Sequence, residues 1–170
     1  MGRSRDVQGM PERYHNAESV MSTEYIGPFA DLLGMEFLEQ GEGSNVSRLP
    51  VTDKLLSRNR VLHGGAVFSI ADTSMGLAYG TVSPEGQIGV TNEIKICYFA
   101  PVPKDAQALY TFSKVLHRGR RGGTVECELK TAAGKLVGKA IGSFTLIDDP
   151  IRGAGGGQKF SLKDGMTKGS

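Results

Sequence analysis

The segment 64–80, "GGAVFSIADTSMGLAYG", is the feature that most limits how this chain can fold. Apolar and small residues recur along it at helical spacing on two faces, one with Val67, Ile70, Ala71, Ser74 and Leu77, the other with Phe68, Met75 and Tyr79. A helix that is apolar on all sides has to be buried. We therefore expect a long central helix enclosed by the rest of the chain.

Segments typical of β-strands lie on both sides of this helix. Two strands joined by a Gly-rich turn are expected in residues 35–51, and four more in 88–100, 106–117, 124–131 and 135–147. Because the last four are joined by short turns, neighbours should pair antiparallel as a meander. Apolar and charged residues alternate in 124–131, which predicts that one face of the sheet is exposed to solvent. The fold class is therefore α+β, an antiparallel sheet curled around a helix, with a short apolar-striped helix before it near residues 26–33.

Composition sets the domain organisation and excludes some partners. The chain has 170 residues, a length typical of one domain. Its net charge of 20 − 18 = +2 is far below that of a typical nucleic-acid-binding surface. We expect a mobile N-terminal tail at 1–22, one domain at 23–148 and a mobile Gly/Lys-rich tail at 149–170. The chain shows neither a membrane-length apolar run nor a signal-peptide core, which indicates a cytoplasmic protein.

Two cysteines, Cys97 and Cys127, lie in strand-like apolar segments. We expect both to be buried thiols, with no disulfide and no metal site.

Asp72 is the only acid between Val61 and Pro84. It could be a structural carboxylate at a helix edge, or a partly desolvated one with a raised pKa that acts as general base or nucleophile. His63-Gly64-Gly65 opens the helix, where bare backbone N–H groups could face an incoming oxygen as an oxyanion site. Alternatively, the glycines only permit the turn and His63 caps the helix. Serine-hydrolase chemistry is not indicated, because no Gly-x-Ser-x-Gly motif occurs.

The order and spacing of these motifs over residues 29–147 resemble the hotdog-fold acyl-CoA thioesterases, in particular the phenylacetate-degradation-type branch. The resemblance lies in "LGMEFLEQGEG", "VLHGGAVFSIADTSMGLAYG", "GVTNEIKICYFAPV" and "KVLHRGRRGGTVECELKTAAGKLVGKAIGSFTL". It implies a His-Gly-Gly turn before a central helix wrapped by an antiparallel sheet. It also implies hydrolysis of an acyl-CoA thioester, supported by an acid on that helix.

The resemblance also implies roles for individual residues. Asp72 would be the base or nucleophile and Gly64 the backbone donor to the thioester carbonyl. His63 would steady the substrate or the leaving thiolate, and Thr91 would orient water across a subunit boundary. Relatives often carry Asn or Gln six residues before the histidine, where this chain has Ser57; Asn59 could replace it only if the loop runs differently.

The turn 117–123, "HRGRRGG", places three arginines together between two strands. Guanidinium groups there could bind the phosphates of coenzyme A, or the turn could be a solvated hairpin tip. The resemblance favours Gly119 and Arg120 as CoA contacts, with Arg118 beside them. Gly65 and Phe68 are expected to contact the substrate near the helix start.

The resemblance further implies a homodimer with continued strand pairing, or a homotetramer of two dimers. No metal or cofactor is expected beyond the CoA of the substrate, and no nucleic acid or membrane. Two other functions stay open: a hotdog dehydratase or hydratase acting on acyl thioesters, and a non-catalytic acyl-CoA sensor.

Overall fold

The computed structural model describes residues 27–150. The two predicted tails therefore lie almost entirely outside the described residues. The elements follow one another in the order α1 (Pro28–Leu33), β1 (Glu36–Gly41), β2 (Ser44–Pro50), η3 (Asp53–Leu55), α2 (Gly64–Gly80), β3 (Gln87–Tyr98), η4 (Lys104–Ala106), β4 (Ala108–Arg118), β5 (Gly122–Thr131) and β6 (Leu136–Asp148).

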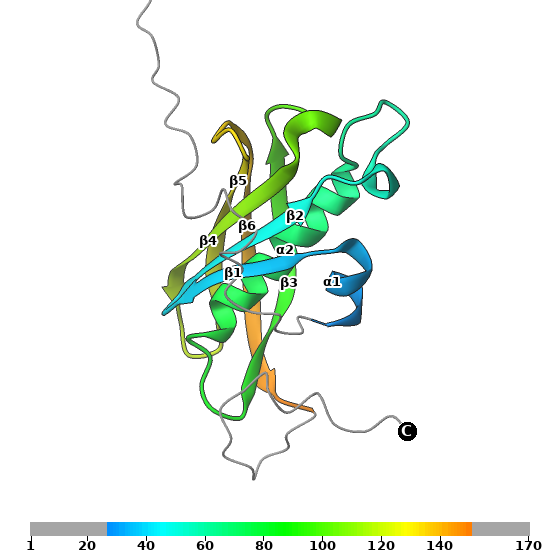
Figure 1. Cartoon of the computed structure of the whole chain (residues 1–170). Helices are drawn as coiled ribbons and strands as arrows, with labels where there is room; N and C mark the ends of the chain where they lie inside the picture. Colours follow the sequence, from blue (N-terminus) through cyan, green and yellow to red (C-terminus); the bar gives the residue numbers. More distant parts are fainter. Residues whose placement is uncertain (1–26, 151–170) are drawn as a thin grey trace, which may run out of the picture.

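Six antiparallel strands form a single sheet that curls around α2 (Figure 1). The helix spans the 17 residues expected from the sequence, and eight of them are buried: Ala66, Val67, Ile70, Ala71, Ser74, Met75, Ala78 and Tyr79. These side chains meet the inward residues of the sheet, such as Leu49, Leu109 and Leu129, which are fully buried. The expected enclosure of the helix by the sheet is confirmed.

The strand order is β1-β2-β4-β5-β6-β3, so the predicted meander is only partly correct. Pairing of β1 with β2, β4 with β5 and β5 with β6 is as expected, but β3 pairs with β6 instead of with β4. The linker after β3 is held against the segment that precedes α2, through the Leu62 N–H to Val102 carbonyl bond and the Val61–Pro103 bridge. These contacts carry the chain across the helix end, so β4 joins the far side of the sheet beside β2.

A buried polar network fixes α2 against the sheet. The Ser74 hydroxyl donates to Oδ1 of Asn45 on β2 (2.9 Å) and lies 2.8 Å from the hydroxyl of Ser113 on β4. Ser47 also donates to the Asn45 oxygen, at 2.7 Å. Because such polar groups must be satisfied when buried, the network permits few rotations of the helix about its axis.

The outer face of the central strands is polar, as the alternation in β5 predicts. Glu126 and Glu128 both pair with Lys139 on the neighbouring strand. On the inner face Cys127 is fully buried, and burial raises the pKa of its thiol to about 11. The prediction that Cys97 is also buried is wrong. It lies opposite Lys139 on the outer face of the edge strand β3, where it is exposed.

The short first helix also differs from its prediction in one respect. Residues Pro28–Leu33 are helical as expected, but the apolar stripe does not face inward: Phe29 and Leu32 are 57% and 78% exposed. Ala30 is buried instead, and Leu33 packs only at the edge of the core. A helix of six residues presents only one side to the sheet, so Phe29 and Leu32 stay outside the core.

Gly122, at the start of β5, offers a test of how tightly the sheet is packed. A Cβ added there would lie 2.1 Å from the Phe144 carbonyl oxygen, a backbone atom of the paired strand. We expect Gly122→Ala to lower the free energy of unfolding by about 1–3 kcal/mol. Gly80→Ala is the matched control, since nothing lies within 4 Å of its Cβ position. That variant should keep the wild-type melting temperature or exceed it, and equal melting temperatures for both variants would contradict this packing.

Candidate functional site

Asp72 is half-buried on α2 and receives a hydrogen bond from Thr91 on β3. The Thr91 hydroxyl donates to Oδ1 at 2.8 Å. Within residues 27–150 no Lys, Arg or His forms an ion pair with this carboxylate. The contact forms within one chain, because β3 runs alongside α2, and needs no second subunit. An acid with one neutral donor and no cation keeps lone pairs free to accept a proton.

The N-terminal turn of α2 leaves one backbone donor unused. The Gly65 N–H donates to Nδ1 of His63 (2.9 Å), and the N–H groups of Ala66 and Val67 donate to the His63 carbonyl (2.9 and 3.1 Å). The Gly64 N–H is the one donor of this turn with no acceptor in the described chain. It lies at the positive end of the helix dipole, where an anionic oxygen is stabilised.

His63 is the N-cap of α2, so the capping role considered from the sequence is present. Since Nδ1 accepts a hydrogen bond, a neutral His63 carries its proton on Nε2. The residue is exposed. The same imidazole can therefore cap the helix with one nitrogen and offer the other as a donor to a bound molecule.

The structure accounts differently for the glycines at positions 64 and 65. A Cβ on Gly65 would lie 3.0 Å from Nδ1 of His63, so the cap itself requires a small residue. A Cβ on Gly64 would meet only the Tyr98 ring at ordinary contact distance (3.8 Å), and its φ is not positive. Nothing within the chain therefore demands glycine at 64, and the bare Cα leaves space above the free N–H for another molecule.

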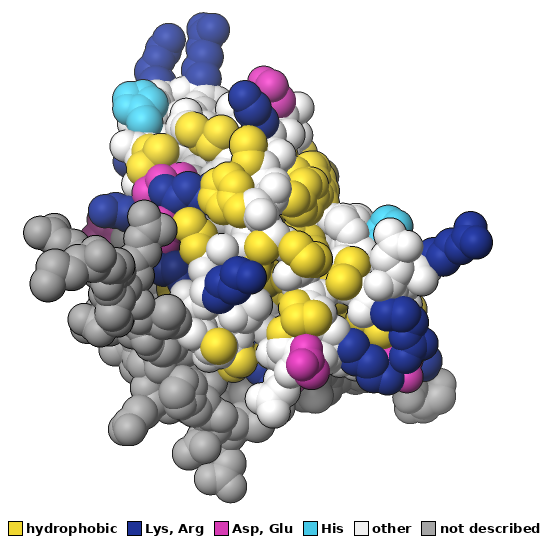
Figure 2. Space-filling view, turned by 90° about the horizontal axis from the view of Figure 1, so that it is seen from above, with side chains coloured by type: hydrophobic (Ala, Val, Ile, Leu, Met, Phe, Trp, Pro, Cys, Tyr) yellow, Lys and Arg dark blue, Asp and Glu magenta, His cyan; other side chains and the backbone are white. Residues whose placement is uncertain are grey.

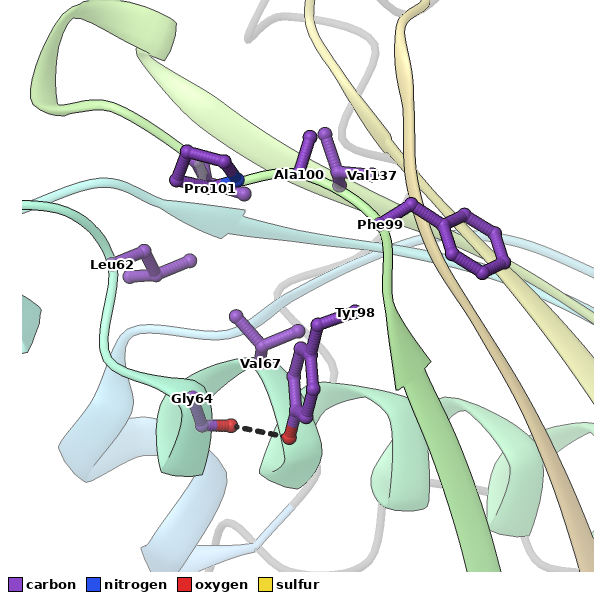
Figure 3. A pocket seen from close by; sticks show the side chains of 9 residues that line it. Leu62, Gly64, Val67, Tyr98, Phe99, Ala100, Pro101 and Val137 are labelled. Atoms are coloured by element: carbon purple, nitrogen blue, oxygen red, sulfur yellow. Dashed lines mark hydrogen bonds between the residues drawn. The ribbon is translucent and has the colours of Figure 1, made fainter.

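An apolar cavity of about 250 Å³ opens beside Gly64 (Figure 3). Its lining comes from the α2 start and the segment before it, from the end of β3 with its linker, and from β6. It consists of Leu62, Gly64, Val67, Tyr98, Phe99, Ala100, Pro101, Val102 and Val137. Apart from Gly64, none of these residues was singled out as a site residue from the sequence. The signal was the run "YFAPV", which stays apolar after β3 ends. Phe68 is exposed on α2 and is not part of this lining.

The residues predicted for the site lie in three separate places in one chain. Gly64 and Asp72 are eight positions apart (72 − 64) on one helix, about 12 Å along its axis at 1.5 Å per residue. The arginine turn, closed by the Gly119 N–H to Gly122 carbonyl bond of 2.7 Å, lies near Tyr79, further along the same helix. There the positive charge of Arg118 opposes the rise that burial causes in the pKa of Tyr79.

Comparison with known proteins agrees with this architecture. Residues 59–137, which include Gly64, Asp72 and Thr91, match the family model described as the thioesterase superfamily. The esterase-like protein SSO2140 of Saccharolobus solfataricus is 36% identical over 120 residues, 71% of this chain and 84% of that protein. The acyl-coenzyme A thioesterase PaaI of Escherichia coli is 27% identical, over 73% of this chain and 86% of PaaI.

This chain belongs to the thioesterase superfamily. Among solved structures, the conserved protein PA5202 of Pseudomonas aeruginosa has a TM-score of 0.67 and 34% identity, covering 77% of this chain and 98% of that chain. The structure of E. coli PaaI has a TM-score of 0.65 and 26% identity, covering 71% and 85%. The hotdog fold and the phenylacetate-degradation-type (PaaI-like) branch, both expected from the sequence, are confirmed.

Within this thioesterase fold, the loop before His63 places Ser57 and Asn59 differently. Asn59 is exposed at the tip of a tight turn that the Ser57 N–H to Val61 carbonyl bond closes (2.8 Å), and Arg60 there has a φ of 60°. The turn therefore leaves Asn59 exposed. The Ser57 hydroxyl is buried with no hydrogen-bond partner in the described chain, so it is the side chain of this loop with unused bonding capacity.

Residues 27–150 contain no group of three or more His, Cys, Asp or Glu side chains arranged to hold a metal ion. No helix in this part of the chain is long and apolar enough to cross a membrane.

Proposed function

We propose that this protein hydrolyses an acyl-CoA thioester to the free acid and CoA. The observation that carries the proposal is the presence of two groups with free bonding capacity on one buried helix. They are the Gly64 N–H beside an apolar cavity and the Asp72 carboxylate, which accepts one bond from Thr91 and pairs with no cation in the described chain. An N–H at a helix start suits a developing oxyanion. A carboxylate with free lone pairs suits a base toward water, or a nucleophile.

In the proposed reaction the Gly64 N–H binds the thioester carbonyl oxygen as negative charge develops there. Asp72, oriented by the Thr91 hydroxyl, takes a proton from water while the water oxygen bonds to the carbonyl carbon. The carbon–sulfur bond then breaks and the thiolate of CoA leaves, with the Nε2–H of His63 at the helix start as a hydrogen-bond donor that steadies it. The proton that Asp72 took from water passes to the thiolate or to solvent, which restores the carboxylate. One well-aimed backbone donor contributes about 3 kcal/mol to transition-state stabilisation, and the chemistry uses no metal.

The distance along α2 supports a site built from two chains. Gly64 and Asp72 are about 12 Å apart along the axis, so they cannot both reach one carbonyl group. An isologous dimer with antiparallel α2 helices would bring Gly64 of one protomer to Asp72 of its partner, and the reverse at a second site. The edge strand β3 lies beside α2 and has one unpaired side in the described chain, which suits continued strand pairing with a second copy.

Exposed apolar side chains support association of several copies. Ile88 and Val90 on β3, and Ile141 and Ile147 on β6, are all exposed. Figure 2 shows apolar side chains gathered across the middle of one face, with Lys and Arg mostly at its rim. A soluble monomer rarely leaves large apolar patches uncovered. We propose a homodimer, with pairing of two dimers into a tetramer as the way to cover the remaining surface.

Arg118, Gly119 and Arg120 are proposed to bind the phosphates of CoA. Arg118 and Arg120 are exposed on the β4–β5 turn, which lies beyond Asp72 on the side of α2 away from Gly64. In the composite site this turn and Asp72 belong to one protomer and the Gly64 donor to the other. A pantetheine arm would then run from the thioester toward the arginines, which suit phosphate geometry.

Dehydration or hydration of an acyl thioester, and acyl-CoA sensing without catalysis, are the rival functions. A dehydratase needs both an acid and a base about the β-carbon, whereas the described residues offer one carboxylate and one oxyanion donor. A panel of short, medium, long and aromatic acyl-CoAs with a thiol reagent separates the three. Thiol release supports hydrolysis, a change in double bonds supports the dehydratase, and binding alone supports the sensor.

Replacing Asp72 with Asn tests the catalytic assignment. We expect thiol release to fall about 10²-fold or more, because a general base is lost. The amide can still accept the Thr91 hydrogen bond, so the oligomer should persist and the melting temperature should hold or rise. Asp105→Asn, at an exposed acid of η4, should leave both quantities unchanged. A destabilised but active Asp72→Asn would show that the acid is structural.

Arg120→Ala tests the phosphate contact. A remote contact made equally in ground and transition states affects KM alone. We expect KM for acyl-CoA to rise about 3- to 10-fold with kcat nearly constant, and thioesters that lack the nucleotide to be unaffected. Lys114→Ala, at an exposed cation elsewhere on β4, is the control. Equal losses with both classes of substrate would mean that the turn is structural.

A further inference from the structure

The Tyr98 hydroxyl bonds to the first residue of α2. Tyr98 is the last residue of β3, and its hydroxyl donates to the Gly64 carbonyl at 3.1 Å (Figure 3). Its ring lines the apolar cavity beside the α2 start and is the group that a Cβ on Gly64 would meet, at 3.8 Å. Tyr98 therefore ties the end of the sheet's edge strand to the turn that carries the free Gly64 N–H.

This bond holds the Gly64–Gly65 peptide group from outside the helix. The carbonyl of the Gly64–Gly65 peptide accepts from Tyr98, and the N–H of the same peptide donates to Nδ1 of His63. A peptide group is planar, so bonds at both of its ends fix its orientation. Two consecutive glycines have unusual backbone freedom, which bonds from outside the helix reduce.

We propose that Tyr98 is a positioning residue that fastens the first residue of α2 to the end of β3. Together with the bonds that the His63 carbonyl accepts from Ala66 and Val67, it fixes the helix start from which the Gly64 N–H points to the substrate carbonyl oxygen. The expected effect on catalysis rests on the proposed function. The expected effect of Tyr98 on the structure of the helix start does not depend on that function. An oxyanion donor is effective only when its direction is fixed before the reaction. A small misplacement of the donor is enough to lower the rate.

The hydroxyl, not the ring, is the group that does this. Burial raises the pKa of Tyr98, so the hydroxyl keeps its proton and remains a donor throughout the neutral range. The ring alone would serve equally well as a cavity wall. Phenylalanine at this position would preserve the wall and remove only the bond to the peptide.

The test compares Tyr98→Phe with Tyr79→Phe in the full-length protein. Tyr79 is fully buried, stacks on Phe144, and has a hydroxyl with no hydrogen-bond partner in the described chain. Its replacement should leave kcat and KM unchanged. For Tyr98→Phe we expect kcat for an acyl-CoA to fall about 10-fold or more, with KM within about 3-fold of wild type and an unchanged melting temperature.

Backbone order parameters of the Gly64 and Gly65 amides, measured by NMR without substrate, supply a readout independent of the reaction. They should be near 0.85 in the wild-type protein, the value of a rigid backbone, and clearly lower in Tyr98→Phe. An unchanged kcat, a rise in KM alone, or unchanged order parameters would overturn the inference. Wild-type protein that releases no thiol from any acyl-CoA refutes the proposed function instead, while the order parameters still decide whether Tyr98 holds the peptide.

Discussion

The burial of α2 inside the curled sheet is the constraint on which the rest of the structure depends. A helix enclosed along most of its length exposes its backbone only at its ends and its side chains only where the sheet stops. Here those openings are the Gly64 turn beside the apolar cavity and the β3 side of the helix, where Asp72 meets Thr91. The same enclosure that stabilises the domain therefore selects where chemistry can occur.

The rotation of α2 about its axis decides whether Asp72 faces β3 or the core. The hydrogen bonds among Asn45, Ser74 and Ser113 hold that rotation, because a turned helix would leave these buried groups unpaired. Ser74 lies two positions after Asp72, so it points to a different side of the helix. The hydrogen bonds of Ser74 to β2 and β4 thus fix the direction in which Asp72 points toward β3.

Much of the fold follows from local patterns in the sequence. The sequence predicts the α2 boundaries, the β1–β2 hairpin and the inward face of β5, because hydrophobic periodicity and turn residues alone determine them. It does not predict the partner of β3, since a short linker allows several partners and the choice rests on contacts of Val102 and Pro103 with a distant loop. The exposure of Cys97 has the same cause, because it depends on β3 being an edge strand.

The candidate site was predictable in its residue types but not in its geometry. Gly64 and Asp72 were identified by motif and resemblance, whereas Tyr98 was missed because a tyrosine at a strand end carries no periodic or spacing signal. Its hydrogen bond to Gly64 appears only when β3 is placed beside the start of α2. The resemblance likewise assigned Gly64 and Asp72 to one reaction, although the helix rise separates them by about 12 Å in one chain.

A mixed dimer of two inactive variants tests the composite site most directly. One subunit carries Asp72→Asn. The other carries Gly64→Pro, which removes the N–H at a helix position where proline is tolerated and which suits the extended His63 before it (ψ 136°). Gly64→Ala, which keeps the N–H, is the control. Each variant alone should lose activity about 10²-fold or more, and co-expressed, doubly tagged mixed dimers should recover about half of the wild-type rate, since one of the two sites is intact. Mixed dimers no more active than the separate variants would contradict a site shared between two chains.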